Sequence, residues 1–348
     1  MRSKKKKKTS NILLKVKKIL SLTSLSINKK TFYSSDSHFF LFFLASTCFL
    51  ISLFLIVVFP KSVRKVSHGE VLSLQMDYKR IPLKDRVFVL KPVLKNGVFS
   101  FPILSAQSVI GLDLDTNVTL YEKNPDLPVL PASITKLVTA MVALESFDKN
   151  ALFSFNGEYI DGQKMGLLKG ERMKVIDLIN ALLVYSANDA AYLLAENYPG
   201  GVEAFVQAMN EKAASLGALN THFENPTGFD GQNHKTTASD LMLISKAAID
   251  NPDILDIVKK KEIDLVSSDG KIRHNLKNTN KLLGILDGVV GLKTGWTENA
   301  RENLVTYFVK DNHHLLIVLL GSQDRFGETK ELIDWIFSSY DWLWVEAK

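Results

Sequence analysis

Ser133 and Lys136 are the residues of this chain whose types and spacing most directly suggest catalysis. They lie three residues apart in PASITKLVTA, residues 131–140, where an apolar helical pattern begins. That spacing places a hydroxyl and an amine on one face of a helix, one turn apart. A serine nucleophile needs a base, and an amine at this distance can supply one. The spacing alone decides little, because Ser-x-x-Lys occurs six times in the chain and helix capping also explains a serine at this position.

Two further polar clusters follow in the same part of the chain. Ser186-Ala187-Asn188 interrupts the apolar helical stretch 174–197, where polar side chains need partners. Lys293-Thr294-Gly295 is the only Lys-Thr-Gly of the chain, and a glycine on a strand there lets another backbone or a ligand come close. Taken singly, each cluster has a simple structural explanation: a helix cap for the first, a helix break for the second and an exposed lysine for the third. These explanations account much less well for all three clusters in this order in one domain.

The elements that must position these clusters are predicted from periodicity and turn residues. Strands are expected within 105–123, on either side of a turn at Asp115-Thr116-Asn117, and a hairpin is expected at Asp269-Gly270. The remaining expected elements are helices over 133–147, 174–197 with a break near 185–188, 202–216 and 237–250, an ordered loop over 221–235, three strands within 288–322, and a closing amphipathic helix over 327–346 containing Trp335 and Trp342. Strands first and last, with helices between them, predict an α+β fold whose antiparallel sheet is built from both ends of the domain.

The positive charge of the chain is concentrated at its N-terminus. Residues 1–38 contain eleven Lys or Arg residues and one acidic residue, a net charge of +10, whereas the whole chain carries +6. The excess of positive charge therefore belongs to the N-terminal tail, and we expect no nucleic-acid binding by the folded part. Hydrophobic residues make up 46% of the 348 residues, enough for a sizeable core.

One transmembrane helix is predicted over residues 39–59, an uncharged apolar run of 21 residues. About 20 residues cross a bilayer as a helix, and the basic N-terminal flank places residues 1–38 in the cytoplasm. A linker or stalk, 60–97, then leads to a domain over 98–348 on the outer side. A cleaved signal peptide is the alternative, but the leading segment and the apolar run are long and no A-x-A pattern follows. The single cysteine, Cys48, lies in this run, which excludes an intrachain disulfide and a Cys-based metal site.

The three clusters, in this order, resemble the motif set of the penicillin-recognising serine enzymes. The closer resemblance is to the low-molecular-weight penicillin-binding proteins that act as D-alanyl-D-alanine carboxypeptidases, and it covers about residues 100–345. It is also carried by the stretches MKVIDLINALLVYSANDAAYLLAE, THFENPTGFDGQNHKTTASDLMLISKAAI, NTNKLL and DGVVGLKTGWT. The resemblance implies a β-lactamase/DD-peptidase-like fold with a helical subdomain, on the outer face of a bacterial cytoplasmic membrane.

The family's nucleophile and base map onto Ser133 and Lys136. A lysine base near pH 7–8 requires the site to lower the side-chain pKa by roughly 3, about 4 kcal/mol, and burial and the charge of Lys293 both act in that direction. The resemblance implies that Ser186 relays the proton to the leaving amine. It also implies that Asn188 holds Lys136 and the peptide carbonyl of the substrate.

The third motif is expected to bind the substrate's end. Lys293 and Thr294 are expected to bind the terminal carboxylate, beside Gly295, and the backbone N–H groups of Ser133 and Trp296 are expected to form an oxyanion hole. No cofactor or metal is implied. The expected partners are peptidoglycan stem peptides ending in D-Ala-D-Ala, with β-lactams as covalent inhibitors. Two departures from the family pattern, Trp296 after Lys-Thr-Gly and ARENLV at 300–305, bear on substrate preference.

Four alternatives stay open on sequence grounds. A D,D-endopeptidase would cut cross-links with the same residues. A β-lactamase would need a deacylating glutamate, for which Glu224 is the nearest candidate in sequence. A cell-wall binding module could keep the fold without activity. A Ser-His-Asp triad lacks a G-x-S-x-G elbow, and His234 is expected to order its loop instead.

Overall fold

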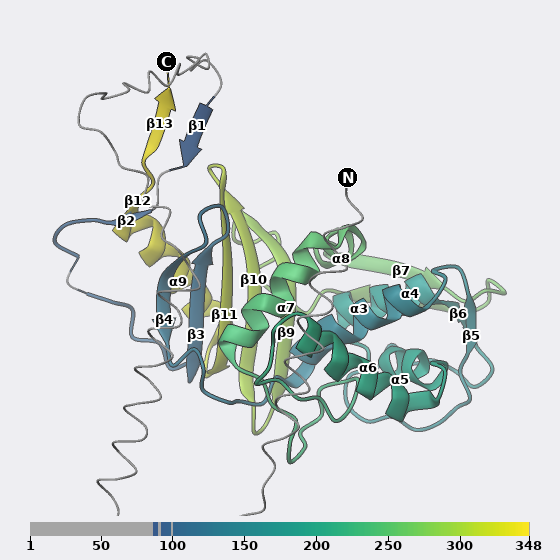
Figure 1. Ribbon diagram of the computed structural model, residues 1–348. Helices are drawn as coiled ribbons and strands as arrows, with labels where there is room; N and C mark the ends of the chain where they lie inside the picture. Colours follow the sequence, from purple (N-terminus) through teal and green to yellow (C-terminus); the bar gives the residue numbers. More distant parts are fainter. Residues whose placement is uncertain (1–85, 90–91, 99, 348) are drawn as a thin grey trace, which may run out of the picture. The chain divides into compact units, whose positions relative to one another are not determined.

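A five-stranded antiparallel sheet is the centre of the described domain (Figure 1). The computed structural model describes residues 86–89, 92–98 and 100–347. The strand order is β4-β3-β11-β10-β9, and β3 from the start of the domain pairs with β11 from its end. The strands are β3 (Ser108–Asp113), β4 (Val118–Lys123), β9 (Val289–Thr297), β10 (Arg301–Lys310) and β11 (His313–Ser322). The prediction of a sheet built from both ends of the domain is confirmed.

The two faces of the sheet are covered by separate hydrophobic clusters. Alternate residues of a strand point to opposite faces. In β11, Leu316 and Val318 join the large cluster under the helical group, while Leu315 and Ile317 join the smaller one under α9 (Arg325–Ser339). Figure 1 accordingly shows α9 on one face of the sheet and the other labelled helices on the opposite side.

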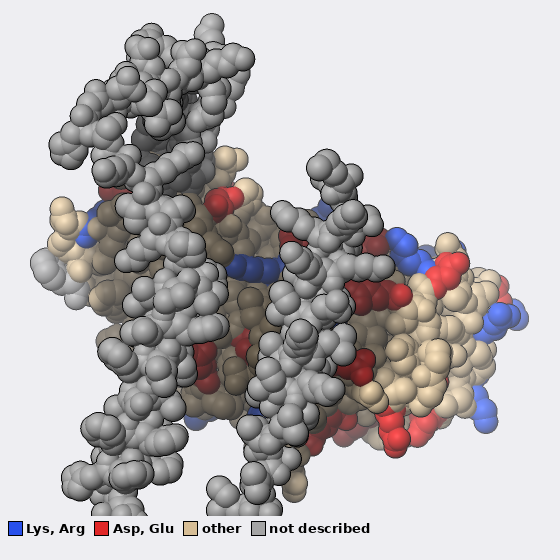
Figure 2. All heavy atoms as spheres, in the orientation of Figure 1, with Lys and Arg blue, Asp and Glu red and all other residues tan. Residues whose placement is uncertain are grey.

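The helical group contains the elements that carry two of the three motifs. Its members are a 3₁₀ turn (Ala132–Thr135), α3 (Lys136–Ser146), α4 (Val175–Asn180), a π-helix (Ala181–Tyr185), α5 (Asn188–Glu196), α6 (Gly201–Ser215), α7 (Ala238–Asp250) and α8 (Pro252–Val258). The helices of this group pack around one core in which most apolar side chains are fully buried. Figure 2 shows both acidic and basic side chains on the part of this surface that the view leaves uncovered.

The helical stretch 174–197 breaks where the sequence predicts. α4 runs into the π-helix, which ends at Ser186 in the left-handed region with φ 67°. A left-handed serine cannot continue a helix, and π-turns are frequent next to functional sites. α5 then starts afresh at Asn188. The break therefore places Ser186 and Ala187 between two helices, with Asn188 as the first residue of α5.

Four short strand pairs complete the described part of the chain. They are β1 (Arg86–Val89) with β13 (Trp344–Ala347), β2 (Val93–Leu94) with β12 (Tyr340–Asp341), β5 (Leu152–Ser154) with β6 (Arg172–Lys174), and β7 (Glu262–Val266) with β8 (Arg273–Lys277). The β7–β8 pair confirms the hairpin predicted at Asp269-Gly270. The pairs made by β1 and β2 bring part of the predicted linker 60–97 against the end of the chain.

The predicted end of the closing helix is wrong. α9 begins at Arg325, where Asp324 caps it by accepting from Gly327 N at 2.9 Å, and it ends at Ser339. Tyr340 is extended and pairs with β2, so Trp342 lies beyond the helix. The indole of Trp342 donates a hydrogen bond to Asp113 Oδ2 at 2.7 Å. Trp342 therefore has a structural contact outside the helix, although its place in the sequence continues the apolar pattern of that helix.

No helix among the described residues is long and apolar enough to cross a bilayer. The predicted transmembrane helix 39–59 and the basic tail 1–38 lie outside the described residues.

Candidate active site

One pocket of about 520 Å³ collects residues from all three motifs. Ser133, Ser186 and Asn188 line it, together with the Thr294-Gly295-Trp296 segment of β9. The other residues that line it are Gly162, Gln163, Thr227, Gly228, Phe229, Thr279, Thr297, Glu298 and Arg325. Lys136 and Lys293 lie deeper, with 0% and 1% of their surface exposed. The structure therefore brings all eight predicted site residues to one place, six of them at the surface of the pocket.

Ser133 sits in a tight turn that the surrounding fold holds in place. Ala132 has φ 48°, a left-handed conformation that is unfavourable for a residue with a Cβ. Just before it, Leu130 O accepts a hydrogen bond of 2.9 Å from Asn303 of β10. Such strain persists only when the surroundings over-determine it, and it often accompanies functional sites. The turn projects Ser133 at the start of α3 without making it the helix cap.

Gly295 has no side chain because the Ser133 turn lies against it. A Cβ at Gly295 would stand 2.9 Å from Pro131 O and 3.2 Å from Ser133 N. The first distance is below ordinary contact, so only glycine allows β9 and the turn to approach this closely. The prediction that another backbone approaches this glycine is confirmed.

Lys136 is the first residue of α3, and its side chain points back at Ser133 in the preceding 3₁₀ turn. Its Nζ lies 2.9 Å from Ser133 Oγ and 2.5 Å from Thr227 O. Burial holds the pKa of Lys136 well below its ordinary value, the charge of Lys293 lowers it further, and Asp189 opposes both. A buried amine that loses its proton easily, beside a hydroxyl, is the pairing that a serine nucleophile requires.

The loop 221–235 supplies the second contact of Lys136. Asn225 Oδ1 accepts from the backbone N–H groups of Thr227, Gly228 and Phe229 at 2.8–3.2 Å. This fan of bonds turns Thr227 O toward Lys136. The loop is thus ordered, as predicted, and forms one wall of the pocket.

Lys293 lies behind Ser186 rather than at the pocket surface. Its Nζ donates to Ser186 Oγ at 3.1 Å and to Thr294 O at 3.0 Å. Burial lowers the pKa of Lys293 to about 7, with a smaller contribution from the charge of Arg325. The buried amine of Lys293 can therefore donate a proton to Ser186 or accept one from it.

Asn188 does not make the predicted contact with Lys136. Its Nδ2 donates to Asp161 O at 2.9 Å, and its backbone N–H donates to Gln163 O at 2.7 Å. The hydrogen-bond partners of Lys136 Nζ are instead Ser133 Oγ and Thr227 O. Asn188 instead joins α5 to the segment that contains Gly162 and Gln163.

Arg325 is a charged pocket residue that was not predicted from the sequence. It is the first residue of α9, and its Nη1 donates to Gly295 O at 2.7 Å. Its Nε is buried without a hydrogen-bond partner among the described residues. Burial lowers the pKa of Arg325, with Glu302 opposing, but a guanidinium stays charged at neutral pH. A cation therefore lines the pocket next to Gly295, with one buried donor unpaired among the described residues.

The two residues weighed for other chemistries lie away from the serine. His234 is buried, its Nδ1 accepts from Glu224 N at 3.1 Å, and its Nε2 contacts Thr135 Oγ1 at 2.9 Å. Burial lowers the pKa of His234 to about 4, so it is neutral and orders its loop. Glu224 is exposed and does not line the pocket.

Comparison with known proteins identifies the family of this site. Residues 97–324 match the sequence profile of the peptidase S11 family, described as D-alanyl-D-alanine carboxypeptidase. The chain belongs to this family. A family relative, the D-alanyl-D-alanine carboxypeptidase DacF of Bacillus subtilis, is 31% identical over 246 residues, which cover 68% of this chain and 63% of the relative. The D-alanyl-D-alanine endopeptidase of Escherichia coli is 33% identical over 245 residues, 68% of this chain and 79% of that protein.

Solved structures of DD-peptidases share the fold. The DD-transpeptidase of Streptomyces K15 is 28% identical, with a TM-score of 0.65 over 69% of this chain and 99% of that one. The α+β fold described above is thus a DD-peptidase fold. The chain spans 63% of the length of DacF and the same share of DacC of Escherichia coli.

Proposed function

We propose that this protein is a serine-type D-Ala-D-Ala carboxypeptidase, which removes the terminal D-alanine of peptidoglycan stem peptides through an acyl-enzyme on Ser133. One observation carries the proposal. A fully buried lysine amine, with a pKa held well below its ordinary value, lies 2.9 Å from a serine hydroxyl that faces the pocket.

In acylation, Lys136 takes the proton of Ser133 Oγ as the oxygen attacks the carbonyl carbon of the penultimate D-alanine. The backbone N–H groups of Ser133 and Trp296 hold the resulting oxyanion. Loss of one such donor typically costs about 100-fold or more in rate. The C–N bond then breaks, and Ser186 relays to the leaving amine the proton that Lys136 took from Ser133, which returns Lys136 to its neutral form. Lys293 lies behind Ser186, with its Nζ 3.1 Å from Ser186 Oγ.

In deacylation, water attacks the ester on Ser133 and the same groups act in reverse. Lys136 accepts a proton from the water and returns it to Ser133 Oγ as the ester bond breaks, and the acyl group leaves as the shortened peptide. Asn188 lines the acyl side of the pocket, where its amide can contact the peptide backbone of the substrate.

The substrate carboxylate is assigned to Thr294 and Arg325. Both line the pocket, whereas Lys293 is 1% exposed and faces Ser186. Arg325 provides a charged donor that can pair with a carboxylate through two parallel bonds. A binding site for a free C-terminal carboxylate favours an exopeptidase over a general protease.

Labelled penicillin tests the proposal. The full-length protein should become covalently labelled, with the adduct on the peptide that contains Ser133, and Ser133→Ala should not label. Incubation with a pentapeptide ending in D-Ala-D-Ala should release one equivalent of free D-alanine. Equal labelling of the wild type and Ser133→Ala would overturn the proposal.

A D,D-endopeptidase is the second candidate, because a relative with that name matches this chain at an identity similar to that of the carboxypeptidases. Digestion of purified muropeptides separates the two functions. Release of D-alanine from pentapeptide monomers supports the carboxypeptidase, and conversion of cross-linked dimers to monomers supports the endopeptidase.

Two other readings have direct tests. Rapid turnover of nitrocefin, in place of a stable adduct, would identify a β-lactamase, although Glu224 lies outside the pocket. A protein that binds peptidoglycan but is not labelled by penicillin would be a binding module.

We also propose that residues 39–59 anchor the protein in a bacterial cytoplasmic membrane, with the catalytic domain outside. The uncharged run of 21 residues after a basic segment supports this. The protein should stay with membranes after carbonate extraction, and protease added outside spheroplasts should digest the domain. Recovery in the soluble fraction would contradict the proposal.

A further inference from the structure

Glu171 and His274 form a buried contact that the proposed chemistry does not use. Glu171 Oε1 lies 2.6 Å from His274 Nε2, and the side chains of His274 and Glu171 are 6% and 0% exposed. Glu171 directly precedes β6 and His274 lies in β8, so the contact joins two separate hairpins. Burying such groups is costly unless each has partners, so the arrangement of those partners indicates what the pair holds.

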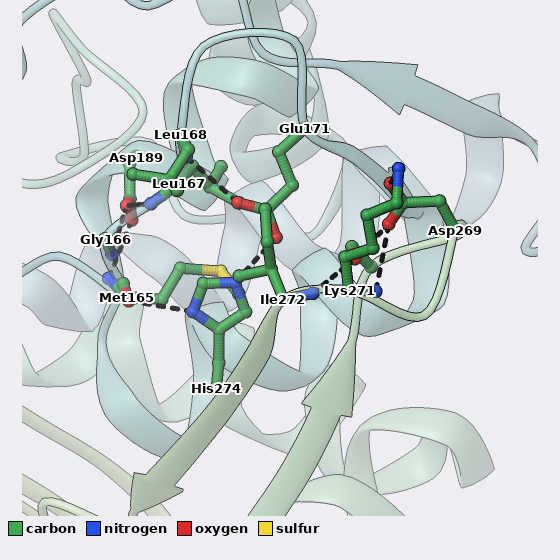
Figure 3. A network of polar contacts seen from close by, with 11 residues as sticks. Met165, Gly166, Leu167, Leu168, Glu171, Asp189, Asp269, Lys271, Ile272 and His274 are labelled. Carbon is green, nitrogen blue, oxygen red and sulfur yellow. Dashed lines mark hydrogen bonds and ion pairs between the residues drawn. The ribbon is translucent and has the colours of Figure 1, made fainter.

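The pair holds one short segment from one side, while Asp189 holds it from the other (Figure 3). Met165 O accepts from His274 Nδ1 at 3.1 Å, and Met165 N donates to Asp189 Oδ1 at 3.0 Å. Further along, Leu168 N donates to Glu171 Oε2 at 2.9 Å. The backbone N–H groups of Gly166 and Leu167 donate to Asp189 Oδ2 at 2.8 and 3.1 Å.

The clamped segment continues into the pocket wall. We call residues 161–168 the pocket loop. Gly162 and Gln163 of this loop line the pocket, and two hydrogen bonds join the loop to Asn188, at Asp161 O and Gln163 O. The position of Asn188 and of this wall therefore depends on how firmly the loop is held.

The hydrogen bonds fix the number of protons on the pair. Nδ1 of His274 faces a carbonyl oxygen, which only accepts, so Nδ1 carries a proton. The short Glu171–His274 contact then needs one more proton between carboxylate and ring. A glutamine in place of Glu171 can replace this arrangement without charge, because its carbonyl accepts from Leu168 N and its amide donates to Nε2. A leucine in the same place can make neither bond.

We propose that Glu171 and His274 are positioning residues for acylation: by clamping Met165 and Leu168 they hold the pocket loop, and with it Asn188, in the geometry that the substrate needs. This inference rests on the proposed function of Ser133. It assigns a role in the site to the β7–β8 hairpin, whose own residues do not line the pocket.

Penicillin acylation of full-length variants tests the clamp. In Glu171→Leu and in His274→Phe, the rate constant of acylation at saturating penicillin should fall roughly 10- to 100-fold, the loss typical of a reacting group displaced by about 1 Å. Glu171→Gln should stay within about threefold of the wild type, because it keeps the bonds to Leu168 and His274.

A matched control separates positioning from stability. Leu332→Ala removes a fully buried side chain of α9 on the opposite face of the sheet, far from the loop in the packing. It should lower the melting temperature yet keep the acylation rate at about 25 °C within about threefold, since it removes packing and no loop contact. If Glu171→Leu also keeps that rate, the clamp is refuted while the function of Ser133 stands. If the wild type itself is not labelled on Ser133, the proposed function fails first.

A measurement on the wild type covers the case in which the leucine and phenylalanine variants do not fold. In protein labelled with ¹⁵N-histidine, His274 Nδ1 should carry a proton that exchanges slowly, and the amides of Gly166, Leu167 and Leu168 should be protected from hydrogen exchange. An unprotonated Nδ1, or unprotected amides in all three residues, would overturn the proposal without any variant.

Discussion

Lys136 Nζ lies 2.9 Å from Ser133 Oγ and 2.5 Å from Thr227 O. The amine is fully buried, and burial and Lys293 together keep its pKa well below the ordinary value. Two oxygen atoms of fixed position, Ser133 Oγ and Thr227 O, thus orient a base that has little access to water.

Acylation should depend on pH through Lys136. The base form is the neutral amine, which predominates above the lowered pKa, so the acylation rate should fall as the pH is lowered and reach a plateau at higher pH. Because Lys136 and Lys293 interact, the midpoint belongs to the pair. Stopped-flow labelling with penicillin between about pH 5 and 9 measures the profile.

The matched variant is Lys136→Arg, which keeps a charge that cannot be removed. Its acylation rate should be lower by about 100-fold or more at every pH, the usual contribution of a general base. A wild-type rate that does not change with pH would exclude Lys136 as the titrating base.

Stability should rise with pH because of Lys293. Its folded-state pKa of about 7 lies below the unfolded value, so between these values the unfolded chain binds more protons and the free energy of unfolding increases with pH. From pH 7 to 9 the increase from this group is about 2 kcal/mol. Lys293→Met should lack this increase in the free energy of unfolding, while the increase that comes from the lowered pKa of Lys136 remains. Urea unfolding of both proteins at the two pH values measures the difference, and identical increases would contradict the prediction.

Gly162→Ala should impair the site through Asn188. Gly162 has φ 73°, and a Cβ there would stand 2.7 Å from Asn188 Nδ2. The variant should acylate roughly tenfold more slowly, since the amide must move. Gly166→Ala is the control: its φ is 88°, with nothing within 4 Å of an added Cβ. It should show the backbone cost of about 1–2 kcal/mol in stability but a nearly normal acylation rate. If Gly166→Ala loses as much acylation rate as Gly162→Ala, backbone strain and not the contact with Asn188 causes the loss.

Thr279 should support the hydroxyl of Thr294. The two Oγ1 atoms are 2.6 Å apart, and both residues line the pocket. If Thr294 donates to the substrate carboxylate, it must accept from Thr279. Thr279→Val should therefore raise KM for a D-Ala-D-Ala peptide about fivefold, the value of one neutral hydrogen bond, while Thr279→Ser should keep it. A change in kcat alone would assign Thr279 to another step.

Arg325 should determine affinity for the substrate carboxylate. Arg325→Gln should raise KM for a peptide with a free C-terminus by roughly 10- to 100-fold, because hydrogen bonds between charged groups are the stronger class. The same variant should bind a C-terminally amidated peptide as the wild type does. Equal losses for both peptides would indicate that Arg325 acts by holding Gly295 O.

The parts of the site that could be predicted from the sequence are those that local patterns encode. Ser133 and Lys136 are one turn apart, Ser186 breaks a helix, and Gly295 marks a close approach, so each has a local signal. Arg325 has none, because only the docking of α9 on the sheet brings it to Gly295 O. The partner of Asn188 is likewise decided by the pocket loop, which no periodic pattern describes. The end of α9 is misplaced by the pattern because pairing with β2 overrides the helical periodicity after Ser339.

The pairing of β3 with β11 also constrains how the domain folds during synthesis. Val109 lies beside Leu319, so the middle of the sheet closes only after almost the whole domain has been synthesised. Contacts this distant in sequence slow folding, and they leave earlier segments exposed in the meantime. The turn that carries Ser133 is made early, but its two neighbours in the pocket, Gly295 and Arg325, arrive late. A ribosome-bound or prematurely terminated chain that ends before Gly295 would therefore carry the proposed nucleophile without two of the residues that line its pocket.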